Sequence, residues 1–159
     1  MACQGNEPSE ADVAAFEQLA GFRLPDDFRE FTKSGLGGLY MEVSEDLWPP
    51  AKRHDVGPAW SFWRAIKVFG IASDIPEWLD IRKQLEGFRV HSREHVPFLQ
   101  IESDADRYCF DRSGAIVRWD HETGDFTPVN GTFAELLLRE IRELEQRKER
   151  VLHGERRAR

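Results

Sequence analysis

Two β-turns that lie close together constrain the fold of this chain more than any other feature. Residues 111–114 (Asp-Arg-Ser-Gly) have the aspartate and the glycine that a type I turn favours at its first and fourth positions. In a three-residue hairpin loop this glycine is left-handed, which places Phe110 opposite Ile116. Residues 122–124 (Glu-Thr-Gly) form a similar turn one strand later. The sequence therefore predicts a meander of antiparallel strands.

The register of this hairpin divides its side chains between two faces of the sheet. The two sets are Cys109, Val117 and Trp119 on one face, and Tyr108, Phe110 and Ile116 on the other. Since both faces carry apolar groups, we expect the hairpin to lie inside the sheet, with a buried Cys109. The nearby acids fall mainly in turns, where aspartate accepts hydrogen bonds from backbone N–H groups. We therefore interpret this stretch, His121 included, as structural, and predict no catalytic or metal-binding residue in it.

Two helices are predicted before the first strand. Ser9 and Asp12 form an approximate capping box, and apolar residues follow at helical spacing. Pro25 suits the start of a second helix, whose Phe28 and Phe31 would face the core. The stretch 34–38 (Ser-Gly-Leu-Gly-Gly) comes after that helix, so we interpret it as a helix end and turn. A phosphate-binding loop would precede a helix instead.

Short strands and one short helix are predicted in the middle of the chain. The candidate strands are residues 39–43, 65–71, 88–90 and 97–101. A helix fits residues 77–85, and Gly87 would stop it.

The last helix has the clearest boundaries. Thr132 and Glu135 make a capping box, and an apolar stripe follows. The stripe consists of Phe133, Leu137, Ile141 and Leu144. Beyond Leu144 the residues are almost all charged, so we expect the helix to leave the core there. The sequence thus predicts a disordered N-terminus (1–8), one domain (9–144), and a charged helix extension with a basic tail (145–159).

This order of elements predicts an α+β fold, with an antiparallel sheet of about five or six strands and helices from both chain ends packed on it. A formal charge of −7 argues against nucleic-acid binding and would suit a basic partner. The N-terminus lacks the pattern of a signal peptide, and no apolar stretch is long enough to span a membrane. We therefore expect a soluble cytoplasmic protein; the sequence does not predict its oligomeric state.

Residues 91–95 (His-Ser-Arg-Glu-His) match the H-x-x-E-H motif of some zinc proteases. That motif needs both histidines on one face of a stable helix. Here Pro97 lies just beyond, and it disfavours helical geometry at Val96. We expect a loop, with no metal and no cofactor.

Several segments occur in an order that resembles the SUKH superfamily. They are residues 19–38 (beginning Leu-Ala-Gly-Phe-Arg-Leu-Pro), 96–101 (Val-Pro-Phe-Leu-Gln-Ile), 108–122 and 132–137. The resemblance covers residues 13–138. That superfamily includes fungal cell-wall-assembly regulators and bacterial proteins that protect against polymorphic toxins. The resemblance implies a single SUKH-like domain that binds other proteins and has no catalytic site.

We accordingly predict a non-enzymatic binding protein, an immunity protein that neutralises a cognate toxin with a basic surface. The predicted contact residues are Glu42, Glu45, Asp46, Glu102, Asp104 and Asp106, with an aromatic anchor at Trp48 or Trp60. One alternative is a regulatory scaffold that binds several cellular proteins. A second, less favoured, is a zinc-dependent hydrolase that uses His91, Glu94 and His95.

Overall fold

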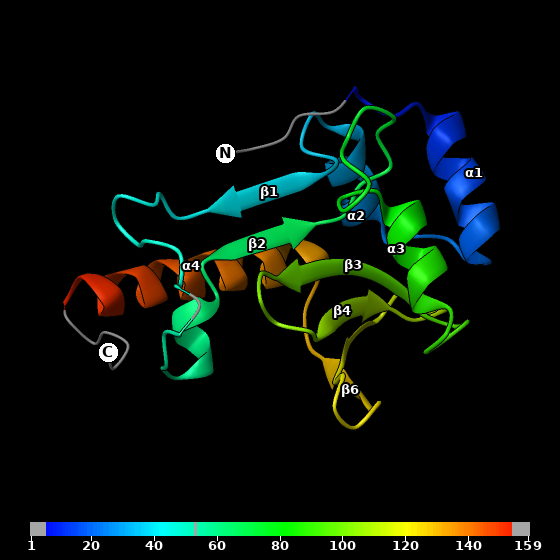
Figure 1. The fold of residues 1–159 in the computed structure, drawn as a ribbon. Helices are drawn as coiled ribbons and strands as arrows, with labels where there is room; N and C mark the ends of the chain where they lie inside the picture. The colour runs from blue at the N-terminus through cyan, green and yellow to red at the C-terminus, as the bar shows by residue number, and fades with distance from the viewer. Residues whose placement is uncertain (1–5, 53, 154–159) are drawn as a thin grey trace.

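The structure is a computed structural model that describes residues 6–52 and 54–153. Its elements are α1 (Glu10–Ala20), α2 (Asp26–Lys33), β1 (Leu39–Glu42), the 3-10 helix η1 (Ala59–Phe62), β2 (Ala65–Val68), α3 (Ile81–Phe88), β3 (Val96–Ile101), β4 (Arg107–Phe110), β5 (Ile116–Trp119), β6 (Phe126–Val129) and α4 (Phe133–Leu152). The six strands form one antiparallel sheet in the order β1-β2-β3-β4-β5-β6. Figure 1 shows α4 behind the sheet and α1 and α2 beside one end of it. The α+β prediction, with helices from both chain ends, is confirmed.

The helix starts follow the predicted capping. The Ser9 side chain accepts a hydrogen bond from the Asp12 backbone, and the Asp12 carboxylate accepts one from the Ser9 backbone. Thr132 and Glu135 make the same reciprocal pair at the start of α4. Each box satisfies two N–H groups that a helix end would otherwise leave without a partner.

The β4–β5 hairpin has the predicted register. Phe110 lies opposite Ile116, and Cys109 lies opposite Val117. Gly114 has φ +82° and donates its backbone N–H to the Asp111 carbonyl. The face with Cys109 packs against the end of α3, while the face with Phe110 belongs to the main core. Burial raises the pKa of the Cys109 thiol, so it stays protonated as a small apolar group.

Four phenylalanine rings join the helices to the sheet. Phe28 of α2 lies edge-on to Phe110 of β4, with ring centroids 5.1 Å apart, and to Phe133 of α4 at 5.0 Å. Phe98 of β3 stacks on Phe110 at 3.9 Å. Edge-to-face and offset contacts of this kind add to the free energy gained by burying the rings. The cluster fixes where α2 and α4 sit on the sheet.

The glycine-rich stretch after α2 allows two backbones to pack together. A Cβ on Gly70 would overlap the backbone of Gly37, and a Cβ on Gly37 would overlap the Thr32 carbonyl. The stretch follows α2 and forms a turn, as predicted. These two glycines therefore serve close packing beside β2.

Gly70→Ala should lower the free energy of unfolding by about 3 kcal/mol, because backbone atoms of Gly37 cannot move aside for a methyl group. Chemical denaturation measures this. Gly35→Ala is the matched control, since a Cβ there meets no atom within 4 Å. Equal stability of the two variants would contradict the packing argument.

The region around α3 differs from the prediction. The helix begins at Ile81, because the Asp80 side chain caps it by accepting from the Arg82 backbone N–H at 2.8 Å. It runs through Gly87 to Phe88, since Leu85 and Phe88 continue its buried side. The predicted strand at residues 88–90 is wrong; Phe88 ends α3 and Val90 is 82% exposed.

α4 also continues further on the core than predicted. Beyond Leu144, the guanidinium of Arg147 lies over the Trp63 ring and that of Arg150 over the Trp60 ring, 3.8 Å from its centroid. Val151 packs against the main core. The expectation that the helix leaves the core after Leu144 is therefore wrong, because arginines covering tryptophans extend the buried side.

The structure describes part of each chain end, and these residues can be compared with the predicted disordered N-terminus and basic tail. Residues 6–8, predicted to be disordered, include a buried Pro8 and an Asn6 N–H that donates to Asp74 at 2.6 Å. The first five residues and the basic end of the tail (154–159) lie outside the described residues. The single domain at 9–144 stays a prediction. None of the helices described here is both long and apolar enough to cross a membrane.

Candidate functional site

Two acidic loops, far apart in the sequence, meet at one end of the sheet. Glu42, the last residue of β1, lies opposite Ala65 at the start of β2. On the other side of Ala65, its carbonyl accepts the backbone N–H of Glu102 at 2.8 Å. The β1–β2 connection and the β3–β4 loop therefore emerge side by side. We call this the acidic end of the sheet; its acids are Glu42, Glu45, Asp46, Glu102, Asp104 and Asp106.

The acids near β1 are only loosely paired. Glu42 accepts a hydrogen bond from the Tyr40 hydroxyl at 2.9 Å. Burial, together with this carboxylate, raises the pKa of Tyr40, which keeps the hydroxyl protonated as a donor. Glu45 is exposed and lies 3.9 Å from Arg64. Asp46 is exposed as well. These carboxylates remain largely available to a partner.

The acids of the β3–β4 loop are more firmly held. Arg118 of β5 pairs with Asp106 at 2.8 Å and with Asp104 at 3.4 Å. The His121 ring nitrogen Nδ1 lies 2.7 Å from the other Asp106 oxygen. Glu102 forms an ion pair with Lys67. The loop therefore has its acids positioned by cations on neighbouring strands.

The hydrogen bond between Asp106 and His121 shifts the pKa of both residues. Partial burial raises the pKa of Asp106, but the His121 hydrogen bonds and the Arg118 charge outweigh it, and the net shift is downward. The hydrogen bond to Asp106 raises the pKa of His121 above its usual 6.5. The stabilising effect of protonated His121 is thus fully present below pH 6.5 and is lost as the pH rises through the folded-state pKa.

Asp106→Asn should return the pKa of His121 toward 6.5, because the anionic acceptor is lost. NMR titration of the His121 ring protons measures this. Glu122→Gln is the control: it removes a neighbouring charge without touching the hydrogen bond. If both variants lower the pKa equally, general charge and not the Asp106 contact causes the shift.

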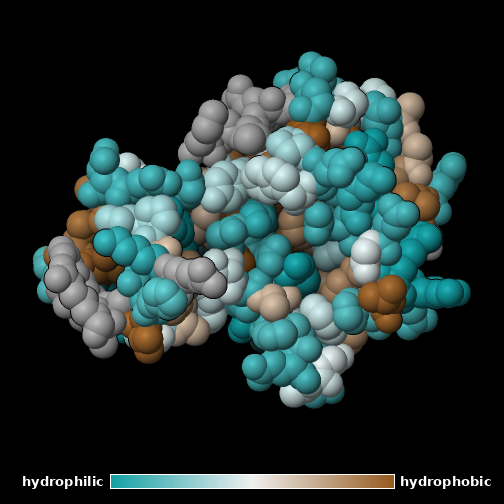
Figure 2. Space-filling model, viewed as in Figure 1, coloured by the Kyte–Doolittle hydropathy of each residue, from teal (hydrophilic) through white to brown (hydrophobic). Residues whose placement is uncertain are grey.

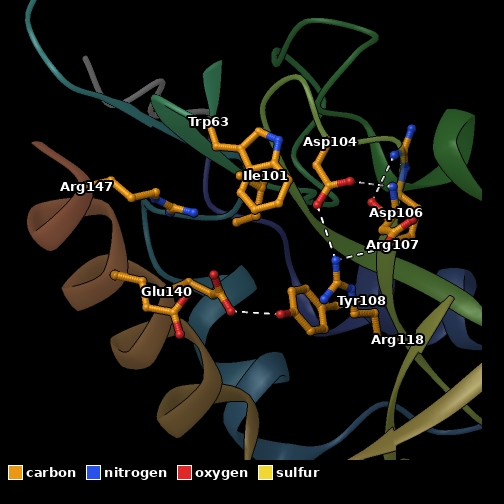
Figure 3. A pocket seen from close by; sticks show the side chains of 10 residues that line it. Trp63, Ile101, Asp104, Asp106, Arg107, Tyr108, Arg118, Glu140 and Arg147 are labelled. Carbon is orange, nitrogen blue, oxygen red and sulfur yellow. Dashed lines mark hydrogen bonds and ion pairs between the residues drawn. The ribbon is translucent and has the colours of Figure 1, made fainter. Parts of the chain in front are cut away.

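A small hollow lies between the β3–β4 loop and α4 (Figure 3). Its volume is about 60 Å³, and its lining includes Asp104, Tyr108, Arg118, Glu140 and Arg147. Glu140 is only 3% exposed and accepts the Tyr108 hydroxyl at 2.8 Å. Burial raises the pKa of Glu140, and the Tyr108 bond only partly offsets this. The hollow is therefore lined by charged groups that are mostly removed from water.

Arg147 is the least satisfied group of this hollow. It is 7% exposed, and its Nε and Nη2 atoms have no hydrogen-bond partner among the described residues. Burial lowers the pKa of Arg147, against the attraction of Glu140 and Glu143. In Figure 3 its side chain extends from α4 toward Trp63, whose ring centroid lies 5.9 Å from the guanidinium carbon. A charged hydrogen-bond donor left open in this way is costly unless water or another group pairs with it.

The geometry argues against a bound metal ion, and the described lining of the hollow offers no hydroxyl or thiol nucleophile of the serine, threonine or cysteine type. Asp104, Asp106 and His121 bring ligand atoms within 4.8 Å of one another. A cation there would have to displace Arg118, which already binds both carboxylates. No serine, threonine or cysteine is among the described residues that line the hollow.

The H-x-x-E-H motif lacks the helix that its chemistry needs. His91 lies in the turn after α3, while His95 precedes β3 and stacks on Phe126 with ring centroids 3.9 Å apart. The loop interpretation of this stretch is confirmed.

The two predicted aromatic anchors, Trp48 and Trp60, differ in how far they are exposed. Trp48 is 2% exposed and belongs to the main core, so it offers no contact surface. Trp60 is half-buried beneath Arg150. Of the two, only Trp60 is placed where a partner could reach it.

Sequence reasoning missed the cationic and buried members of the site. They are Trp63, Tyr108, Arg118, Glu140 and Arg147. One signal was present: Glu140 lies three residues after Leu137 and four before Leu144, on the apolar side of α4. A carboxylate in that position demands a buried partner. Arg147 lies two turns further along the same helix, whereas Trp63, Tyr108 and Arg118 come from separate elements that spacing could not link.

Comparison with known proteins agrees with this architecture. A sequence profile of the SMI1/KNR4 family (SUKH-1) matches residues 7–139. The chain belongs to the SUKH-1 family. A search of curated proteins gave no significant match. The family match ends at Arg139, so Glu140 and Arg147 of this SUKH-1 chain lie outside it.

Proposed function

We propose that this SUKH-1 protein is a non-enzymatic immunity protein that binds a cognate toxin and blocks its basic surface with the acidic end of the sheet. The observation that carries the proposal is the meeting of the two acidic loops on either side of Ala65. Toxins that cleave nucleic acids need basic substrate clefts, and a complementary acidic surface can occupy such a cleft.

The proposed surface has two parts with different roles. Glu45 and Asp46 are exposed, so they steer a basic partner toward the site during encounter. Asp104 and Asp106 are held by Arg118, so they present fixed acceptors whose positions change little on binding. Trp60 supplies an aromatic contact nearby, since α4 covers only part of it.

The visible surface suits a polar interface. Figure 2 shows a face that is mostly hydrophilic, with apolar residues in small separate patches. A partner that docks through charge gives binding that weakens as salt rises. A large apolar interface would show little such dependence.

Affinity capture of the tagged protein from its own organism tests the function. A single stoichiometric partner with a basic toxin domain supports immunity. Several substoichiometric cellular partners would instead support a regulatory role, and binding to no protein would contradict both. Deletion of residues 145–159 would be a poor test of regulation, because it removes Arg147 and Val151 from the fold.

Reversing two exposed charges tests the surface. Glu45→Lys with Asp46→Lys should slow association with the captured partner about tenfold at low salt, because steering toward a basic surface is lost. Surface plasmon resonance measures the rate.

The matched control changes the charge by the same amount at the opposite end of the sheet. Asp26→Lys with Glu94→Lys alters two exposed acids, and Glu94 lies near Arg112 of the β4–β5 turn. The association rate of this control should stay close to that of the unmodified protein. An equal loss in both variants would mean that net charge, and not the acidic end of the sheet, governs binding.

A further inference from the structure

A glycine inside α3 has no packing reason to be there. Gly87 lies in the last turn of the helix, where glycine is less favourable than alanine. Its φ is not in the left-handed region, and a Cβ added to it meets no heavy atom within 4 Å. Gly37 and Gly70 differ, because another backbone fills the space beside them. The space beside Gly87 is therefore open, and close packing does not explain why a glycine stands there.

That space belongs to a hollow between α3 and the sheet, on the face opposite α4. Its volume is about 290 Å³, close to the lower limit of about 300 Å³ for sites that bind small organic molecules. Phe88 and Trp119 form its apolar part, with ring centroids 5.0 Å apart. The His91 ring lies 4.5 Å from the Trp119 ring, so a third aromatic side chain borders this part of the hollow. The size and the aromatic lining suit a small molecule with a ring.

The lining is rich in basic side chains, in a chain whose net charge is −7. Lys83, His91, Arg107 and His121 line it, and no carboxylate does among the described residues. Two of these groups are partly neutralised, since Lys83 lies 3.6 Å from a Glu86 oxygen and His121 bonds to Asp106.

Arg107 is the second permanent cation of the lining, and Asp104 and Asp106 attract it from nearby. Within the described part of the chain it forms no ion pair, and its Nη1 donates to the backbone carbonyls of Ala105 at 2.7 Å and Asp106 at 3.1 Å. It lies directly opposite Trp119 across β4 and β5. A guanidinium beside an indole combines an anion-binding fork with an apolar ring surface.

We propose that this hollow binds a small aromatic anion, with its ring against Phe88 and Trp119 and its anionic group on Arg107. Gly87 keeps the space beside α3 open for the ligand. Mononucleotides and aromatic carboxylic acids share this chemistry. The site lies on the α3 face of the sheet, and it does not depend on toxin binding.

NMR titration of the ¹⁵N-labelled full chain tests the proposal. The probes are AMP and phenylacetate, each compared with its neutral counterpart, adenosine and 2-phenylethanol. At least one anion should shift the Gly87 amide and the Trp119 indole signals, and bind about tenfold tighter than its neutral counterpart. The tighter of the two anions identifies whether the site prefers a nucleotide or an aromatic acid.

Two substitutions locate the binding. Gly87→Leu fills the hollow and should abolish binding, while the melting temperature stays the same or rises, because leucine favours a helix. Gly35→Leu adds the same side chain at a glycine outside the hollow, where a Cβ also meets no atom within 4 Å, and should leave binding unchanged. Arg107→Gln should weaken the anion about tenfold and leave the neutral counterpart unaffected.

Three results would overturn the proposal. The first is no shift of these signals by either anion at about 5 mM, where a site with a Kd of about 1 mM is mostly filled. The second is equal binding of anion and neutral counterpart. The third is full binding by a folded Gly87→Leu variant.

Discussion

The stacked and edge-on contacts among Phe28, Phe98, Phe110 and Phe133 hold the two ends of the chain on one sheet. Burying one such ring contributes about 2 kcal/mol, and the cluster draws its rings from α2, β3, β4 and α4. Because α4 begins at Phe133, its position in this cluster sets the direction of the whole helix. That direction brings the later turns of α4 over the end of the sheet, where the charged groups gather.

Charge at this end of the sheet is arranged in pairs and not as a uniform acidic patch. Arg118 and Lys67 pair with the acids of the β3–β4 loop, whereas Glu45 and Asp46 remain exposed. The exposed negative charge of this end therefore lies mainly in the β1–β2 connection. The paired acids supply a fixed geometry instead.

The sheet has a different environment on each of its two faces. α4 covers one face and encloses Glu140 and Arg147, which are charged and buried. The end of α3 covers part of the other, where Phe88 and Trp119 lie beside Arg107. Tyr108 of β4 lines the hollow beside α4, whereas its neighbour Arg107 reaches both hollows.

Local chemistry made much of the fold predictable. The two capping boxes and the β4–β5 register involve residues close together in the sequence, and all of them form as expected. The prediction for α3 was wrong at both ends. Asp80 caps the helix and sets its start, and the burial of Phe88 carries the helix past Gly87, which was predicted to stop it. The predicted end of the buried part of α4 was also wrong. A pattern of apolar residues does not count an arginine as buried, although here two arginines cover tryptophan rings.

The sequence by itself determined the α+β class, the hairpin, the capped starts of α1 and α4 and the acidic residues of two loops, because short-range hydrogen bonds and side-chain alternation govern these features. Only the tertiary structure decided that the two loops meet beside Ala65 and that Trp48 is buried. It also decided that Arg118 and Arg147 complete the site. These contacts join residues from separate strands and helices, and packing of the whole core is what brings them together.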